Sequence, residues 1–261
     1  AGSDLQKLGV AYVASEMASR PSIREGERWL MSFFTCYAIE SVIVAAFLRD
    51  SPWLESGELS AELSELAFRY LAGSLGLPFI PIRSLRGSDI LRRLQETAPS
   101  EIAYVDDPFT GEDWLVLKPL VPDVAVVQVQ AADEEGNAWI LGPRWDNEEQ
   151  VKAGKRAIVI TERLVPLETI RREPERTIIP GFRVSHVVHL PFAAHPTSVY
   201  QAYDYDADHI RRYVAASQSL QGFEEYLEEY VYGVQDHWAY LERVGGMKHL
   251  TGLVADPVLG Y

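Results

Sequence analysis

The stretch FRVSHVVHL (residues 182–190), followed directly by PFAAHPTS (residues 191–198), decides the fold of this chain. The β-branched residues of its first part predict a buried strand. Two prolines then bracket a loop of small residues, and proline cannot continue a strand ladder. In open α/β sheets, a strand followed by a stiff loop and a helix places ligands at the carboxyl end of the strand. An ordinary connection between a strand and a helix is the alternative that these residues leave open.

Strand and helix patterns alternate outward from this stretch. Strands are expected at 79–83, 101–105, 114–117, 124–129, 138–141 and 157–160, and helices at 60–75, 90–97 and 147–155. The strands are continuous apolar runs, which favours an open, mostly parallel sheet flanked by helices, an α/β fold. The run 124–129 is almost entirely valine and alanine, so we expect it to be a central strand buried on both faces.

The two ends of the chain have different patterns. Residues 207–250 are expected to be helical, at 207–216, 222–232 and 234–244. Near the start, strands are expected at 10–14 and 30–37 and a helix at 39–54. We see no repeat or linker and expect a single domain over residues 1–261.

Composition narrows the function classes. The net charge of −14 argues against nucleic acid or an anionic membrane as a partner. No apolar run is long enough for a membrane span and no signal-peptide pattern opens the chain. The single cysteine, Cys36, cannot form an internal disulfide and fits a reducing compartment, so we expect a cytoplasmic protein.

A local cluster of arginines runs against the acidic balance. Arg83, Arg86, Arg92 and Arg93 face a single acid, Asp89, in this segment. Such a cluster could receive an anionic ligand such as a phosphate. The alternative is that the arginines solvate a helix face and that Ser88 or Asp89 caps the helix.

Other catalytic patterns are weak. His186 and His189 lie three apart in a strand and therefore face opposite sides, so we expect no metal site from the cluster of His186, His189 and His195. Phosphate-binding glycine loops and the serine-nucleophile elbow are absent. Glu55 and Glu65 are candidate catalytic carboxylates, but nothing in the sequence around them distinguishes either from an acidic residue on the solvated surface.

Several motifs together resemble the α-type subunit of family I CoA-transferases, of the glutaconate CoA-transferase kind. They appear in the family's order over about residues 36–261, and no single one is decisive. The matching segments are GLPFIPIR (76–83), GSD (87–89), DPFTG (107–111), PDVA (122–125), ADEEGN (132–137), IPG (179–181), PFAAHPTS (191–198) and YDYD (203–206).

This resemblance implies a CoA ester as substrate, no tightly bound cofactor, and a β-type subunit, often in an α2β2 heterotetramer. In such transferases the acyl-CoA thioester is attacked by a glutamate of the β chain, so Glu55 is not expected to be the nucleophile. The family's α chain normally starts with a glycine-rich loop that stabilises the oxyanion. Residues 1–35 do not show this loop, and we expect it to be absent.

The resemblance also suggests site residues. Glu65 matches a position that looks catalytic in relatives that hydrolyse cyclic CoA esters. The substrate-binding residues it suggests are Ser64, Arg83, Gly87, Ser88, His195, Pro196, Thr197 and Ser198. Three hypotheses follow: the α chain of a transferase, a ring-opening CoA-ester hydrolase that uses Glu65, and a structural subunit without catalytic residues.

Overall fold

The computed structural model of this chain describes residues 58–83, 85–142, 144 and 146–256, and it describes side chains from residue 65 onward. The strands expected at 10–14 and 30–37, the helix at 39–54, Cys36 and Glu55 lie outside the described residues, as does any glycine-rich loop near the start.

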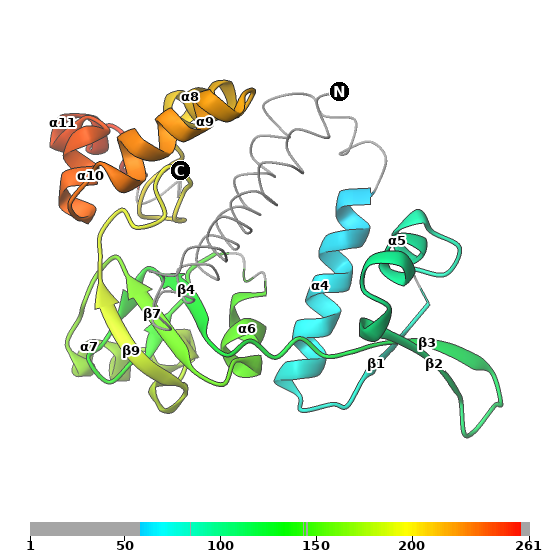
Figure 1. Ribbon diagram of the computed structural model, residues 1–261. Coiled ribbons are helices and arrows are strands. Elements are labelled where there is room, and N and C mark those ends of the chain that lie inside the picture. Colours follow the sequence, from blue (N-terminus) through cyan, green and yellow to red (C-terminus); the bar gives the residue numbers. More distant parts are fainter. Residues whose placement is uncertain (1–57, 84, 143, 145, 257–261) are drawn as a thin grey trace.

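A parallel sheet lies at the centre of the larger part of the fold. Its strands β4 (Ala125–Val129), β7 (Ala157–Thr161) and β9 (Val184–His189) pair in the order β4-β7-β9 (Figure 1). The expected parallel sheet flanked by helices is thus confirmed. The expectation that 124–129 is the central strand is wrong for the described sheet, because β7 lies between the other two. Both runs are apolar and buried, so their composition could not tell the middle strand from its neighbour.

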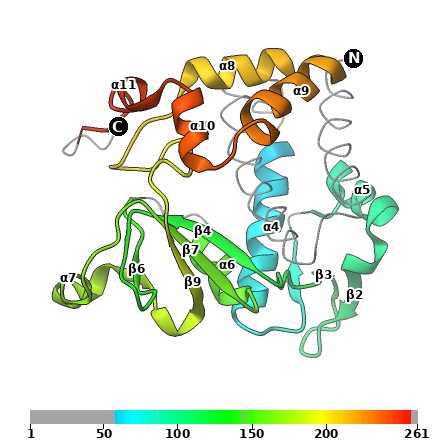
Figure 2. The ribbon, with the colours of Figure 1, turned by 60° about the vertical axis from the view of Figure 1, so that its left-hand side comes forward.

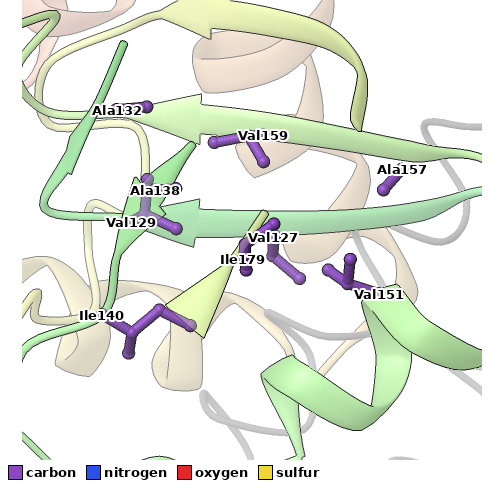
Figure 3. Packing of buried hydrophobic residues seen from close by; sticks show 9 residues of the cluster. All are labelled: Val127, Val129, Ala132, Ala138, Ile140, Val151, Ala157, Val159 and Ile179. Carbon is purple, nitrogen blue, oxygen red and sulfur yellow. The ribbon is translucent and has the colours of Figure 1, made fainter. Parts of the chain in front are cut away.

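The main apolar core forms where this sheet meets helix α6 (Asn147–Ala153) and a small antiparallel sheet. That small sheet contains β5 (Ala131–Ala132), β6 (Ala138–Trp139) and β8 (Thr177–Ile179) in the order β5-β6-β8. Only β6 of this sheet was expected from the sequence. Strands β5 and β8 and the helix α7 (Leu167–Arg172) were not. Figure 3 shows the side chains of this core, which are Val127, Val129, Ala132, Ala138, Ile140, Val151, Ala157, Val159 and Ile179.

A second unit carries most of the arginine cluster. Strands β1 (Ile80–Ile82), β2 (Ile102–Asp106) and β3 (Asp113–Leu117) form an antiparallel sheet in the order β1-β3-β2. Helix α5 (Asp89–Thr97) packs on it through Ile90 and Leu91, which join Leu115 and Leu117 in one buried cluster. The chain returns from β3 to β4 by a link at 118–124.

Helix α4 (Glu58–Ser74) lies between the two units (Figure 1). It packs against α6, and Gly73 allows this approach because a Cβ there would overlap the carbonyl oxygen of Leu120 and lie 3.0 Å from the Cβ of Ala153. The backbone N–H of Leu120 donates to the carbonyl of Arg69 at 3.0 Å. The helix therefore holds the link that joins the two units.

The expected helical C-terminal region is present. Helices α8 (Ala207–Ala216), α9 (Leu220–Leu227), α10 (His237–Arg243) and α11 (Gly246–Leu250) lie beyond the end of β9 (Figures 1 and 2). A five-residue π-helix, Glu228–Tyr232, extends α9. Among the helices of the described ranges, none combines the length and apolar character that a membrane span needs.

Candidate functional site

The carboxyl ends of β7 and β9 carry a buried carboxylate that the sequence motifs did not single out. Glu162 follows β7 directly. Its Oε2 accepts a hydrogen bond from the backbone N–H of Phe192 at 2.8 Å, and its Oε1 accepts one from the hydroxyl of Tyr203 at 3.1 Å. The side-chain amide of Gln128 on β4 donates to the same Oε1 at 2.5 Å. Glu162 thereby fastens the loop after β9 to the end of the sheet.

The environment of Glu162 alters its acidity. Burial raises the pKa of the carboxyl, and the hydrogen bonds from Phe192 and Tyr203 offset part of that rise. A carboxyl whose pKa moves upward toward neutral pH gains capacity for general acid or base work. Both of its oxygens, however, already accept hydrogen bonds inside the protein. This indicates that Glu162 holds the loop in position.

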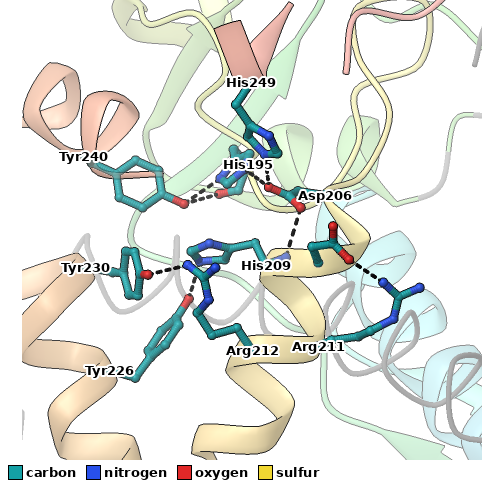
Figure 4. A network of polar contacts seen from close by, with 10 residues as sticks. His195, Asp206, His209, Arg211, Arg212, Tyr226, Tyr230, Tyr240 and His249 are labelled. Atoms are coloured by element: carbon teal, nitrogen blue, oxygen red, sulfur yellow. Dashed lines mark hydrogen bonds and ion pairs between the residues drawn. The ribbon is translucent and has the colours of Figure 1, made fainter. Parts of the chain in front are cut away.

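His195 lies in this loop and turns inward (Figure 4). Its side chain is 1% exposed, and its Nε2 is 3.1 Å from Oδ2 of Asp206. The hydroxyl of Tyr240 is 2.6 Å from the other ring nitrogen, Nδ1. Because a carboxylate only accepts, a neutral His195 donates from Nε2 and accepts the Tyr240 hydroxyl at Nδ1. Burial lowers the pKa of His195, and the hydrogen bond to Asp206 opposes this shift.

Asp206 receives several hydrogen bonds at once. It caps α8 by accepting the backbone N–H of His209 at 2.9 Å, and Nε2 of His249 on α11 lies 2.5 Å from its Oδ2. Burial raises the pKa of Asp206, but the hydrogen bonds from His209, His249 and His195 outweigh burial and hold the pKa at about 2. The aspartate is therefore ionised across the physiological range.

The remaining predicted loop residues divide between the interior and the surface. The His195–Pro196 peptide bond is cis, and the carbonyl of Pro196 accepts the backbone N–H of Asp206 at 2.9 Å. The hydroxyl of Thr197 is buried and donates to the carbonyl of Ala194 at 2.6 Å. Ser198 is exposed. The structure thus brings His195, Pro196 and Thr197 together in one closed turn and leaves Ser198 at its surface.

The arginine cluster borders a second candidate region, on the β1–β3 unit. The guanidinium of Arg83 lies 4.3 Å from the centre of the Trp114 ring and 3.1 Å from Oε2 of Glu112. Together with Arg86 and Asp113, these residues line an open hollow of about 430 Å³. The arginine segment therefore divides, because Arg92 instead pairs with Asp89 on α5 at 2.9 Å.

Gly87 and Ser88 directly precede α5, and Ser88 is its N-cap residue. Gly87 has a φ of +78°, a backbone conformation that side chains disfavour. The hydroxyl of Ser88 accepts the backbone N–H of Leu91 at 3.2 Å and donates to the carbonyl of Leu85 at 2.7 Å. Of the two residues considered as caps, Ser88 and Asp89, it is Ser88 that caps the helix.

Glu65 lies on α4 and does not line the hollow. Its side chain is 13% exposed and accepts a hydrogen bond from Arg69 at 3.2 Å. Arg69 also pairs with Glu101 and donates to the carbonyl of Lys118. Within the ranges that the structure describes, no hydrogen bond or ion pair joins Glu65 to Arg83 or His195. The side chain of Ser64 lies outside the described side chains.

Comparison with known proteins identifies the family. The family described as Coenzyme A transferase matches residues 42–190, more than half of the chain. The chain belongs to this family. The resemblance expected from the motifs is confirmed, and with it the assignment to an enzyme family.

Individual relatives of this CoA-transferase chain agree with the assignment. It is 30% identical to the A-type subunit of the glutaconate CoA-transferase of Acidaminococcus fermentans, over 90% of this chain and 78% of that protein. The crystal structure of the glutaconate coenzyme A-transferase of the same organism matches with a TM-score of 0.70 at 30% identity, covering 80% of this chain and 70% of that one.

Two other relatives match a smaller share of their own length. A protein of Archaeoglobus fulgidus without a named activity is 43% identical over 72% of this chain and 41% of its own length. A cholesterol ring-cleaving hydrolase IpdA subunit of Rhodococcus jostii is 28% identical over 64% of this chain and 58% of its own. This CoA-transferase chain therefore spans about half the length of these two relatives.

Sequence reasoning missed Glu162 and His249 in this CoA-transferase chain. Glu162 could have been found, because it follows a predicted buried strand at the edge where open α/β sheets place functional groups. His249 carried no such signal. It lies in a short C-terminal helix, and only the folding of α8 to α11 brings it to Asp206.

Proposed function

We propose that this chain is the α subunit of a CoA-transferase that moves CoA between an acyl-CoA and a small carboxylic acid, together with a β-type subunit. The observation that carries the proposal is the similarity to the A-type subunit of glutaconate CoA-transferase, which extends over 90% of the chain. Because that relative is a subunit of a larger enzyme, we propose that this chain also works with a partner chain. An α2β2 assembly in the cytoplasm is part of the proposal.

In the proposed reaction the nucleophile is a glutamate of the β subunit. Its carboxylate attacks the thioester carbonyl, the CoA thiolate leaves, and an acyl-glutamyl anhydride forms. The thiolate then attacks the glutamyl carbonyl, which releases the first carboxylic acid and leaves CoA as a thioester on the glutamate. The second carboxylic acid reverses these steps. The residues of this chain bind and orient the CoA ester.

The hollow beside Arg83 suits the anionic part of such a substrate. Arg83 and Glu112 have side chains that are 70% and 61% exposed, so their ion pair contributes only about 0–1 kcal/mol. A phosphate can therefore replace Glu112 as the partner of Arg83 at little cost, and it would accept two hydrogen bonds from the guanidinium. Gly87 and Ser88, which follow Arg86 in the chain, are proposed to contact the pantetheine or the thioester.

The loop after β9 is proposed to line the acyl pocket. Ser198 and Pro196 contribute directly, because Ser198 is exposed and Pro196 is partly so. His195 and Thr197 are buried and act through the shape of the loop. Glu162 supports the same loop through its contact with Phe192.

Trapping of the covalent intermediate tests the proposal. The full chain is co-expressed with a candidate β-type chain, incubated with an acyl-CoA, and treated with hydroxylamine or borohydride. We expect loss of activity only after acyl-CoA is added, with the modified glutamate on the β-type chain. Failure of the two chains to co-purify, or modification of a glutamate in this chain, would refute the division of roles.

A ring-opening CoA-ester hydrolase is the second candidate, favoured by the similarity to a subunit named as a cholesterol ring-cleaving hydrolase. In this reading Glu65 acts as a general base. Glu65→Gln keeps an acceptor for Arg69 but removes the base, so it abolishes hydrolysis and leaves CoA transfer largely intact. Glu101→Gln is the matched control, because Glu101 also pairs with Arg69. Equal loss in both variants would assign Glu65 a structural role instead.

A further inference from the structure

Three potential metal ligands meet where the loop after β9, the start of α8 and α11 come together (Figure 4). They are His195, Asp206 and His249, and their ligand atoms all lie within 4.8 Å of one another. Both imidazoles direct Nε2 at the same carboxylate oxygen, Oδ2 of Asp206, from 3.1 and 2.5 Å. His195 and Asp206 are 11 residues apart in the segment between β9 and α8, and His249 lies 43 residues beyond Asp206, so tertiary folding brings the third ligand to the other two.

We propose that His195, Asp206 and His249 bind a Zn²⁺ ion. Zinc takes imidazole nitrogen and carboxylate oxygen at about 2.0–2.2 Å in a tetrahedron, which places neighbouring ligand atoms about 3.3 Å apart. The separations from Asp206 Oδ2 to the two Nε2 atoms need to change by less than about 1 Å to reach that value. Two imidazoles and one carboxylate suit zinc, whereas Ca²⁺ and Mg²⁺ select sets of oxygen ligands.

The contacts around the three ligands are those that orient a metal site. A histidine that binds a metal through one ring nitrogen normally donates from the other, and a metal-bound carboxylate normally accepts a further hydrogen bond. Nδ1 of His195 lies 2.6 Å from the Tyr240 hydroxyl, and Oδ1 of Asp206 accepts the backbone N–H of His209 at 2.9 Å. On zinc binding, the His195 proton moves to Nδ1 and is donated to the Tyr240 oxygen, at a separation of 2.6 Å that already suits a hydrogen bond.

The site has an entry side. The side chains of His195 and Asp206 are 1% and 5% exposed, whereas that of His249 is 36% exposed. An ion can therefore reach the cluster past His249, and water can take the fourth position of the tetrahedron. The bound ion would tie α11 to the loop after β9, which Glu162 fastens to the sheet through Phe192.

Metal content and a conservative variant test the proposal on the full chain, apart from any CoA-transferase assay. The purified chain is freed of metal with a chelator, titrated with Zn²⁺ by calorimetry, and analysed by elemental mass spectrometry after dialysis. We expect one Zn²⁺ per chain and a rise in Tm on adding Zn²⁺, since ligands of the folded state stabilise it by mass action. Mg²⁺ should produce neither effect.

His249→Gln separates a metal site from a hydrogen-bond network. A glutamine amide can still donate to Asp206, but it is a poor zinc ligand, so zinc affinity should fall at least about 100-fold. His237→Ala is the matched control, because His237 is also half-buried on a neighbouring helix but contacts the carbonyl of Pro191. It should bind Zn²⁺ like the unaltered chain. The proposal is overturned if the unaltered chain retains no stoichiometric zinc, or if His249→Gln binds Zn²⁺ equally well.

Discussion

Removing one hydroxyl group, with the substitution Tyr203→Phe, tests how the loop after β9 is held. The Tyr203 side chain is 2% exposed, and its hydroxyl accepts the backbone N–H of Ala194 at 2.9 Å and donates to Glu162 at 3.1 Å. Phenylalanine keeps the ring, which lies 4.7 Å from that of Phe192, so packing is preserved. The variant therefore removes both of these hydrogen bonds while the ring stays in place.

The expected cost follows from what is left unpaired. Ala194 is 2% exposed, and a buried N–H without an acceptor costs about 1–3 kcal/mol. Glu162 loses one donor, which costs about 1–2 kcal/mol, but it retains the amide of Gln128 and the N–H of Phe192. Because the two losses share a neighbourhood they are not fully additive, and we expect a total of about 2–4 kcal/mol.

Urea unfolding of the full chain, followed by circular dichroism, measures this cost. With a slope of about 3 kcal/mol/M, the midpoint should fall by about 1 M while the slope stays unchanged. Tyr205→Phe is the control, because that ring is 39% exposed, and it should change stability by less than about 0.5 kcal/mol. A Tyr203→Phe chain as stable as the control would show that the hydroxyl does not hold the loop.

Two further substitutions test the packing and the electrostatics. Because burial raises the pKa of Glu162 above its ordinary value of 4.5, the folded state binds this proton more tightly than the unfolded state. The resulting stabilisation is full below pH 4.5 and is lost as the pH rises through the pKa of the folded state. In urea unfolding, the unaltered chain should therefore lose stability relative to Glu162→Gln over that pH range. A stability difference between the two chains that does not change from pH 4 to 8 contradicts this. Gly73→Ala should destabilise the chain by about 1–3 kcal/mol in the same assay, because its Cβ would overlap the Leu120 carbonyl. A more stable Gly73→Ala would show instead that the helix preference of alanine, about 1 kcal/mol, outweighs the contact.

The local patterns predicted the elements well where one signal dominates. The helix expected at 207–216 is observed as Ala207–Ala216, because Asp206 caps its first turn. The runs 124–129 and 157–160 are observed as buried parallel strands. The run after Phe182 also forms a parallel strand, β9, but its residues are partly or fully exposed, so the prediction of a buried strand there is wrong. The runs 79–83, 101–105, 114–117 and 138–141 form antiparallel strands instead. The order of the parallel strands could not be predicted, since 124–129 and 157–160 are equally apolar and only pairing over long sequence separations places β7 in the middle. Strands as short as Ala131–Ala132 carry no periodic signal at all.

The candidate site was harder to predict than the fold. The loop 191–198 was recognised from its prolines, but the sequence could not show that His195 faces inward toward Asp206. The arginine segment 83–93 was seen as one cluster, and the turn at Gly87 divides it between a hollow and a helix surface. His249 could not be connected to Asp206, because side chains far apart in sequence meet only through tertiary packing.

The contacts of Arg69 have a consequence for how the two units are oriented. The backbone carbonyl of Arg69, on α4, accepts the N–H of Leu120, and its guanidinium donates to the carbonyl of Lys118. Arg69 thus holds the link between β3 and β4 at two points. The arginine hollow belongs to one side of that link and the loop after β9 to the other. Arg69 therefore fixes how the chain crosses from one unit to the other. The distance that a long, thin molecule must cover to reach both the hollow and the loop depends on this residue, although the molecule need not contact it.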